Sequence, residues 1–284
     1  FAAQYWGKGD KDAVERILGI VLRTSAAVSV VFFAGTAFFP GMLMRIFTPD
    51  PALIGYGSEY LRIVSVTYLM CGVSQIYLCI MKNSDLAAKS MVIGSTAALL
   101  NIALNAVLIY GLFGAPRMEA AGAAAATAVS RAVELVWVLA ELRKKERIQI
   151  RMKYILHPDP VLRRDFWHYT FPVLGNELVW GGGFTMYSVI MGHLGTDAVA
   201  ANSIANIVKN IIASLAMGIG NGGAIIVGNE LGAGRLEQAR LYGGRLCRIS
   251  ILSGICSGIF LLLISPLVLA ATDLSPEAAE YLKW

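Results

Sequence analysis

Two ionisable side chains lie deep inside long apolar runs, where a charge is suited to binding an ion or a polar ligand. We identify Glu177, in the run from Phe166 to Leu194, as the one acidic residue deep in such a run, and Lys209 lies in the run from Ala198 to Val227. At about 1.5 Å per helical residue, each side chain would lie roughly 16 Å from the end of its run, near the midplane of a bilayer. A charge at that depth is costly unless it is paired, protonated or hydrated, so both are candidate functional residues.

A polar stripe surrounds Lys209. Four residues follow the helical spacing i, i+4, i+7 and i+8: Asn202, Asn206, Lys209 and Asn210. They share one helix face, which would be unfavourable against lipid, so we expect it to face a hydrated cavity or the protein interior. Lys209 could there bond to Glu177, either as a movable pair or as a fixed structural pair. Trp180 lies beside Glu177 and could stack on a flat cationic ligand or simply pack against other helices.

Asn101 and Asn105 form a second polar pair, spaced i, i+4 in an apolar run that begins at Met91. Hydrogen bonds between helices, worth about 0.6 kcal/mol each, are their simplest role. Other candidates for chemistry are dispersed: the sequence has three histidines in different regions and four cysteines without CxxC spacing. We therefore expect no enzyme, metal site or cofactor.

The elements that position these residues are membrane-spanning helices. Hydrophobic residues make up 56% of the chain and charged residues 15%, against about 25% charged residues in soluble domains. Seven apolar stretches can each cross a bilayer: Ile17 to Phe47, Leu61 to Met81, Met91 to Phe113, Ala120 to Leu142, Phe166 to Leu194, Ala198 to Val227, and Leu246 to Thr272. The first is longer than needed, which predicts tilt, a kink at Pro40 or an interfacial extension. The sequence therefore predicts an all-α multi-pass membrane protein.

Lysine and arginine gather in the loops that precede the odd-numbered stretches, most densely between Arg143 and Arg164. By the positive-inside rule these loops are cytoplasmic. This topology explains the net charge of +5 without a nucleic-acid partner. The basic segment 143–165 could be a lipid-binding or nucleic-acid-binding arm, but we favour a linker between two membrane lobes.

An internal repeat supports two lobes. AQYWGKGDKDAV near the start and GNELGAGRLEQA near residue 230 share an amide, two spaced glycines and a charged amphipathic stretch. Six spans separate equivalent points, so a complete protein would have twelve. We expect three parts: the remainder of an N-terminal lobe at 1–142, the linker at 143–165, and the start of a C-terminal lobe at 166–284. Both ends of the chain look cut.

The sequence resembles the bacterial MATE (multidrug and toxic compound extrusion) transporters over essentially its whole length. The likeness is carried by VGNELGAGRLEQAR at Val227 and its partner near the start, by NIALNAVLIYGLFGAP at Asn101, and by FPVLGNELVWGGGF at Phe171. It implies helices three to nine of twelve in a two-lobe, inverted-V bundle that is incomplete at both ends.

The resemblance further implies a monomeric antiporter in the bacterial inner membrane. Such a protein exports organic, amphipathic cationic compounds in exchange for Na⁺ or H⁺, and has no cofactor besides that coupling ion. The resemblance places cation-handling residues near Glu177, Asn101 and Asn105. The closest alternative is a flippase for lipid-linked oligosaccharides or polysaccharides, which would favour a strongly cationic cavity because its substrate carries phosphates.

Overall fold

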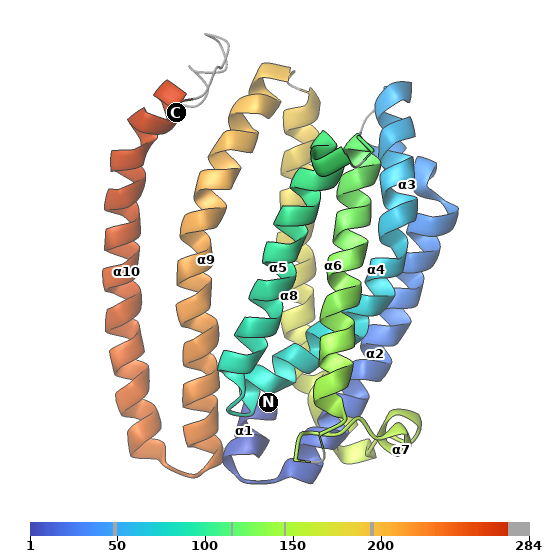
Figure 1. Cartoon of the computed structure of the whole chain (residues 1–284). Coiled ribbons are helices and arrows are strands. Elements are labelled where there is room, and N and C mark those ends of the chain that lie inside the picture. Colours follow the sequence, from blue (N-terminus) through green and yellow to red (C-terminus); the bar gives the residue numbers. More distant parts are fainter. Residues whose placement is uncertain (48–49, 115, 145, 194–195, 272–284) are drawn as a thin grey trace. The chain divides into compact units, whose positions relative to one another are not determined.

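The computed structural model describes residues 1–47, 50–114, 116–144, 146–193 and 196–271, and the regular elements in these residues are all helices (Figure 1). In chain order they are α1 (Ala2–Gly7), α2 (Lys11–Phe38), α3 (Pro40–Phe47), α4 (Pro51–Asn83), α5 (Ala87–Tyr110), the 3₁₀ helix η1 (Leu112–Gly114), α6 (Glu119–Leu142), α7 (Met152–Leu156), α8 (Pro160–His193), α9 (Thr196–Gly232) and α10 (Leu236–Ala271).

Contacts divide the chain into two compact units. Unit 1 comprises Phe1–His168 and unit 2 comprises Tyr169–Trp284, so the boundary falls inside α8. In unit 1, α4 packs against both α2 and α6, and α5 packs against α6. In unit 2, α9 and α10 form an antiparallel pair, which lies side by side in Figure 1.

Six of the described helices are long and apolar enough to cross a membrane, against seven stretches expected from the sequence. They are α2, α4, α5, α6, and the parts of α9 and α10 at Asn202–Gly232 and Leu236–Ile264. The seventh stretch, from Phe166 to Leu194, is not among them. It lies in α8 except for its last residue, Leu194, which is outside the described residues. The 34 residues of α8 are long enough, but Asn176, Glu177 and several glycines make this helix less apolar than the other six. The last expected span likewise ends beyond the described residues, at Thr272.

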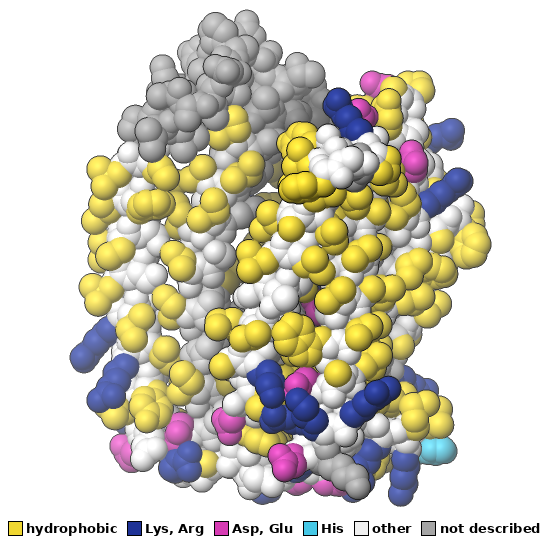
Figure 2. Space-filling model, viewed as in Figure 1, with side chains coloured by type: hydrophobic (Ala, Val, Ile, Leu, Met, Phe, Trp, Pro, Cys, Tyr) yellow, Lys and Arg dark blue, Asp and Glu magenta, His cyan; other side chains and the backbone are white. Residues whose placement is uncertain are grey.

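Large apolar side chains on the outside of unit 1 are the structural mark of a lipid solvent. Val31, Phe38 and Met42 are each about 70% exposed, a pattern that soluble proteins avoid over extended surfaces. Figure 2 shows such side chains along the helices of unit 1, while lysine and arginine gather at the end where α1 and α7 lie. The chain is therefore a multi-pass membrane protein.

Pro40 breaks the first expected span, so the structure shows the kink among the three alternatives that the sequence left open. The helix α2 ends at Phe38, Phe39 leaves the helical conformation with ψ of 38°, and α3 begins at Pro40. Proline has no backbone N–H to donate and its ring crowds the preceding turn, so a continuous helix is unfavourable there.

The two halves of the sequence repeat share one backbone turn. Gly9 and Gly234 adopt positive φ of 81° and 76°. The Gly9 N–H donates to the Trp6 carbonyl at 2.8 Å, and the Gly234 N–H donates to the Leu231 carbonyl at 3.1 Å. Each turn joins a helix that ends two residues earlier to one that begins two residues later. Glycine suits this position because other residues rarely adopt left-handed backbone angles.

The segment after α6 is docked on unit 1. The backbone N–H of Gln149 donates to Glu15 at 3.0 Å, and Arg151 forms an ion pair of 2.6 Å with the same carboxylate, which is only 2% exposed. The Tyr77 hydroxyl of α4 donates to the Ile148 carbonyl at 3.1 Å. These contacts attach the basic segment to the ends of α2 and α4.

A second group of contacts holds α7 and the start of α8 to the first turns of α2. The Tyr154 hydroxyl donates to Asp12 at 2.5 Å, which raises the pKa of Tyr154. Asp159 caps α8, and hydrogen bonds from the backbone N–H groups of Leu162 and Val161, together with Arg16, hold its pKa below the usual value.

Gly19 permits this docking, because a Cβ there would lie 2.8 Å from the backbone of Tyr154. We expect Gly19→Val to destabilise the protein by about 1–3 kcal/mol through overpacking. Gly35→Val is the matched control on the same helix, since a Cβ at Gly35 has no neighbour within 4 Å among the described residues. Thermal unfolding in detergent measures both, and equal midpoints would contradict the docking.

Candidate functional site

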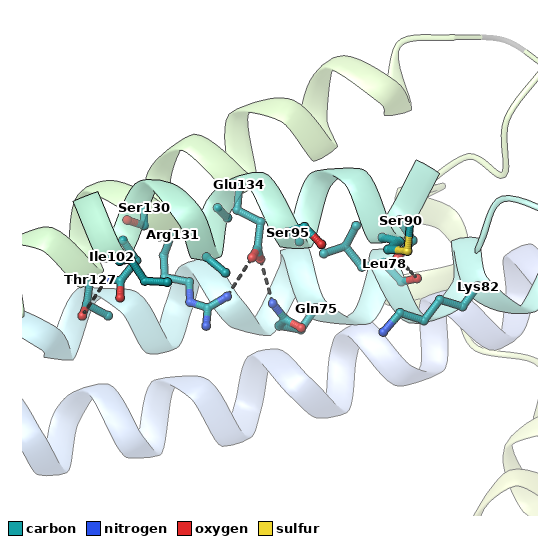
Figure 3. Close-up of a pocket in the computed structure, with 15 residues that line it drawn as sticks. Gln75, Leu78, Lys82, Ser90, Ser95, Ile102, Thr127, Ser130, Arg131 and Glu134 are labelled. Carbon is teal, nitrogen blue, oxygen red and sulfur yellow. Dashed lines mark hydrogen bonds and ion pairs between the residues drawn. The ribbon is translucent and has the colours of Figure 1, made fainter. Parts of the chain in front are cut away.

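Unit 1 contains a cavity of about 590 Å³ between α4, α5 and α6, shown in Figure 3. Its walls are formed by Gln75, Leu78, Lys82, Ser90, Met91, Gly94, Ser95, Ala97, Ala98, Asn101, Ile102, Thr127, Ser130, Arg131 and Glu134. Polar side chains therefore follow the facing sides of three apolar helices, as expected where membrane helices line a hydrated space.

Glu134 is the most buried charged residue in this wall, with 1% of its surface exposed. Its Oε1 accepts hydrogen bonds from Ser74 at 2.5 Å and Gln75 at 2.8 Å, and its Oε2 pairs with Arg131 at 2.7 Å. Figure 3 shows the contacts with Gln75 and Arg131. Donors from two helices thus satisfy the carboxylate. The prediction that Glu177 is the one acidic residue deep in an apolar run is wrong, because Glu134 lies eight residues inside the run that ends at Leu142.

Positive charge in the cavity wall comes from Arg131 and Lys82. The Arg131 side chain is 38% exposed and its charge is balanced by Glu134, whereas the described residues give Lys82 no ion-pair partner within 4 Å. With one balanced and one unbalanced cation, the cavity is weakly cationic. A cavity that binds a phosphate-bearing substrate is expected to be much more strongly basic than this one.

Asn101 lines this cavity, and Asn105 follows it by one helical turn on α5. Asn105 Nδ2 donates to Asn101 Oδ1 at 3.0 Å, and Asn101 Nδ2 donates to Thr127 Oγ1 at 3.4 Å, which links α5 to α6. The Asn105 Oδ1 atom is buried without a hydrogen-bond partner in the described part of the chain. Asn101 therefore joins two helices, and the Oδ1 atom of Asn105 can still accept a hydrogen bond from a ligand.

In unit 2, Lys209 lies against an aromatic ring. Its Nζ is 4.5 Å from the centroid of the Phe184 ring, and the rings of Phe184 and Trp180 are 4.7 Å apart. Among the described residues, no ion pair joins Lys209 to Glu177, and both side chains are exposed within this unit. Phe184 follows Glu177 by seven residues, about 10 Å along a helix, so the ammonium lies at the level of Phe184 and not of Glu177.

Two of the three asparagines near Lys209 form a hydrogen bond with each other. Asn206 Nδ2 donates to Asn202 Oδ1 at 3.0 Å, and both side chains are half-buried, whereas Asn210 is exposed. The structure thus places the predicted residues in two separate groups: Asn101 and Asn105 in unit 1, and Glu177, Trp180, Asn202, Asn206, Lys209 and Asn210 in unit 2.

Comparison with known sequences identifies relatives. The MatE family model matches residues 1–107 and 172–284, which is well over half of the chain. Multidrug resistance protein NorM of Vibrio vulnificus is 29% identical over 184 residues, covering 64% of this chain and 39% of the relative. Probable multidrug resistance protein NorM of Thermotoga maritima is 26% identical over 290 residues, covering 98% of this chain and 60% of the relative. The chain spans about half the length of the curated relatives it matches.

Solved structures share the fold. A MOP superfamily transporter from Pyrococcus furiosus superposes with a TM-score of 0.82 at 20% identity, covering 99% of this chain and 62% of that one. A multidrug resistance MATE family transporter in an outward-facing conformation gives the same TM-score and identity, with 99% and 63% coverage. The all-helical architecture expected from the sequence is confirmed.

Proposed function

Because this chain belongs to the MatE family of membrane transporters, we propose that the transporter is a secondary antiporter that exports organic compounds in exchange for Na⁺ or H⁺. A MATE transporter is not an enzyme, so its residues serve binding and conformational change. Two relatives named as multidrug resistance proteins support drugs as the exported compounds. We propose that these compounds are amphipathic.

The repeated backbone turn is the observation that carries this proposal. Equivalent turns at Gly9 and Gly234 introduce equivalent helices in unit 1 and unit 2. Transporters built from homologous halves commonly alternate access by moving one half against the other around a central site. We propose that units 1 and 2 belong to two such lobes, and that the protein acts as a monomer.

Exchange requires that cation and substrate binding be coupled through two conformations with different affinities. Glu177 is the proposed coupling carboxylate, because it is an acid well inside α8, a helix long enough to cross a membrane, and the described residues supply it with no ion pair. Asn101 and Asn105 are proposed to serve the cation in the N-terminal lobe through their carbonyl oxygens, one of which has no hydrogen-bond partner among the described residues. Hard cations such as Na⁺ prefer oxygen ligands of this kind.

Efflux from vesicles containing the full-length protein tests the function. Na⁺ and pH gradients are imposed separately, and export of a fluorescent organic dye is followed. We expect export to depend on one of the gradients, which identifies the coupling ion. Export that ignores both gradients, or movement of a lipid-linked oligosaccharide in place of the dye, would favour the flippase alternative.

A further inference from the structure

Arg23 is the last charged residue of α2, and the rest of that helix is apolar or weakly polar. It lies 12 residues after Lys11, about 18 Å along the helix at 1.5 Å per residue. Its side chain is exposed, as are those of Val30 and Val31 farther along α2, at 54% and 70%. The described residues offer its guanidinium neither an ion pair nor a hydrogen bond. An unpaired cation inside a membrane-spanning helix is costly and marks a functional position.

The second copy of the sequence repeat contains an equivalent arginine. Arg23 follows Gly9 of the first turn by 14 residues, and Arg248 follows Gly234 of the second turn by the same number. Arg248 is the last charged residue of α10, and its side chain is exposed within unit 2. In the described part of the chain it too has no ion pair or hydrogen bond. The two copies of the repeat thus share an exposed arginine without a protein partner.

Around Arg23, unit 1 has the mixed character of a membrane interface. Gly19 precedes Arg23 by one helical turn on the same face, and a Cβ there would lie 2.8 Å from the backbone of Tyr154 in α7. Helical side chains lean toward the N-terminus of their helix, so that of Arg23 leans toward α7. The exposed residues of α7 include apolar and basic side chains: Met152, Lys153 and Leu156. Such a mixture is typical of the headgroup region of a bilayer, which long basic side chains reach from the hydrocarbon.

A lipid phosphate is the counter-charge that suits this position. The carboxylates at the junction of α2 with α7 and α8, Asp12 and Asp159, are both already paired with Arg16. The apolar run of α2 begins at Ile17, so Arg23 lies about 9 Å inside it, and its long side chain extends back toward the interface. A guanidinium can donate to two phosphate oxygens at once. The other basic residues at this end of unit 1, shown in Figure 2, favour a lipid with a net negative charge.

We propose that Arg23 and Arg248 are equivalent binding sites for an anionic phospholipid, one in unit 1 and one in unit 2. The lipid belongs to the leaflet that faces the basic loops, which is cytoplasmic by the positive-inside rule. At each site the guanidinium donates to the lipid phosphate, and the acyl chains lie along the apolar part of the helix that follows. For Arg23, these chains cover Val30 and Val31. This inference goes beyond the proposed export function and does not depend on it.

Native mass spectrometry of the full-length protein in detergent measures the lipids that stay bound. Phosphatidylglycerol is the anionic probe and phosphatidylcholine the zwitterionic one, and we expect the wild-type protein to prefer the first. Arg23→Gln and Arg248→Gln should each lower the affinity of one site about fivefold, the effect of one basic residue near an anionic surface, and the double variant should have no preference. Arg143→Gln is the matched control, because it removes an exposed arginine just after α6, outside the apolar runs, and should keep the preference.

The glutamine variants should fold, because neither arginine has a partner among the described residues, and thermal unfolding in detergent checks this. Arg23→Lys keeps a cation and should keep the preference for phosphatidylglycerol. Equal retention of both lipids by the wild-type protein, an unchanged preference in the folded double variant, or an equal loss in Arg143→Gln would overturn the proposal. Displacement of the lipid by inorganic phosphate would also overturn it, because the site would then bind a free anion. Efflux from vesicles tests the export function separately, so either proposal can fail while the other stands.

Discussion

Glu134→Ala is expected to lower the free energy of unfolding by about 3 kcal/mol. Removing one member of a buried ion pair leaves the other charge unpaired. Such changes lower stability by about 3–5 kcal/mol when the pair is fully buried. The lower end applies because Arg131 is 38% exposed and can reach water. Ser74, which is fully buried, loses its acceptor as well. Thermal or denaturant unfolding in detergent measures the loss.

Two further variants separate the causes. Glu134→Gln keeps an acceptor for Ser74 but loses the charge facing Arg131, so its loss should be intermediate. Glu59→Ala removes an exposed acid of α4 and should change stability by no more than about 0.5 kcal/mol. If Glu134→Ala matched the Glu59 control, the buried network would have no role in stability.

Glu177→Gln is expected to reduce gradient-driven export at least tenfold while leaving the protein folded. Coupling between two ligands corresponds to about 1–3 kcal/mol, or 5- to 150-fold, and it disappears when the coupling cation has no carboxylate to bind. Folding should persist because Glu177 is exposed in unit 2 and has no ion pair among the described residues. Efflux and the thermal midpoint are measured on the same preparations, with Glu237→Gln in the first turn of α10 as the control.

The alternative role of Glu177, a structural pair with Lys209, has a different signature. Both single changes would then destabilise the protein, and Glu177→Gln combined with Lys209→Met would restore expression and export together. Full export by that double variant would contradict a coupling role for Glu177. The Lys209 ammonium lies over Phe184 and not beside Glu177. We therefore expect neither single change to destabilise the protein.

The features that depend on a single helix or a single turn could be predicted from the sequence. The long apolar runs predicted the helices, Pro40 indicated where a kink between α2 and α3 could lie, and the spaced glycines predicted an internal repeat, whose two copies form equivalent turns. Each follows from chain geometry that a few neighbouring residues control: apolar length, a missing N–H or a positive φ. The polar stripe of Asn202 and Asn206 was likewise visible, because helical periodicity puts them on one face. The one expected span that fell short, in α8, contains the very polar residues that make it a candidate site.

Which side chains contact one another could not be predicted, because it depends on how the helices pack. Periodicity gives the face of a helix but not its neighbour, its axial offset or its rotation, all of which depend on packing against other helices. For this reason Glu134 was overlooked, although it lies in an apolar run: its importance comes from Ser74 and Gln75 on another helix. The same reason explains Lys209, whose depth alone suggested a bond to Glu177 but whose ammonium lies over Phe184. The basic segment after α6 was interpreted as a linker between two membrane lobes. Its attachment to Glu15 arises because a helix distant in sequence presents a buried carboxylate that needs those donors.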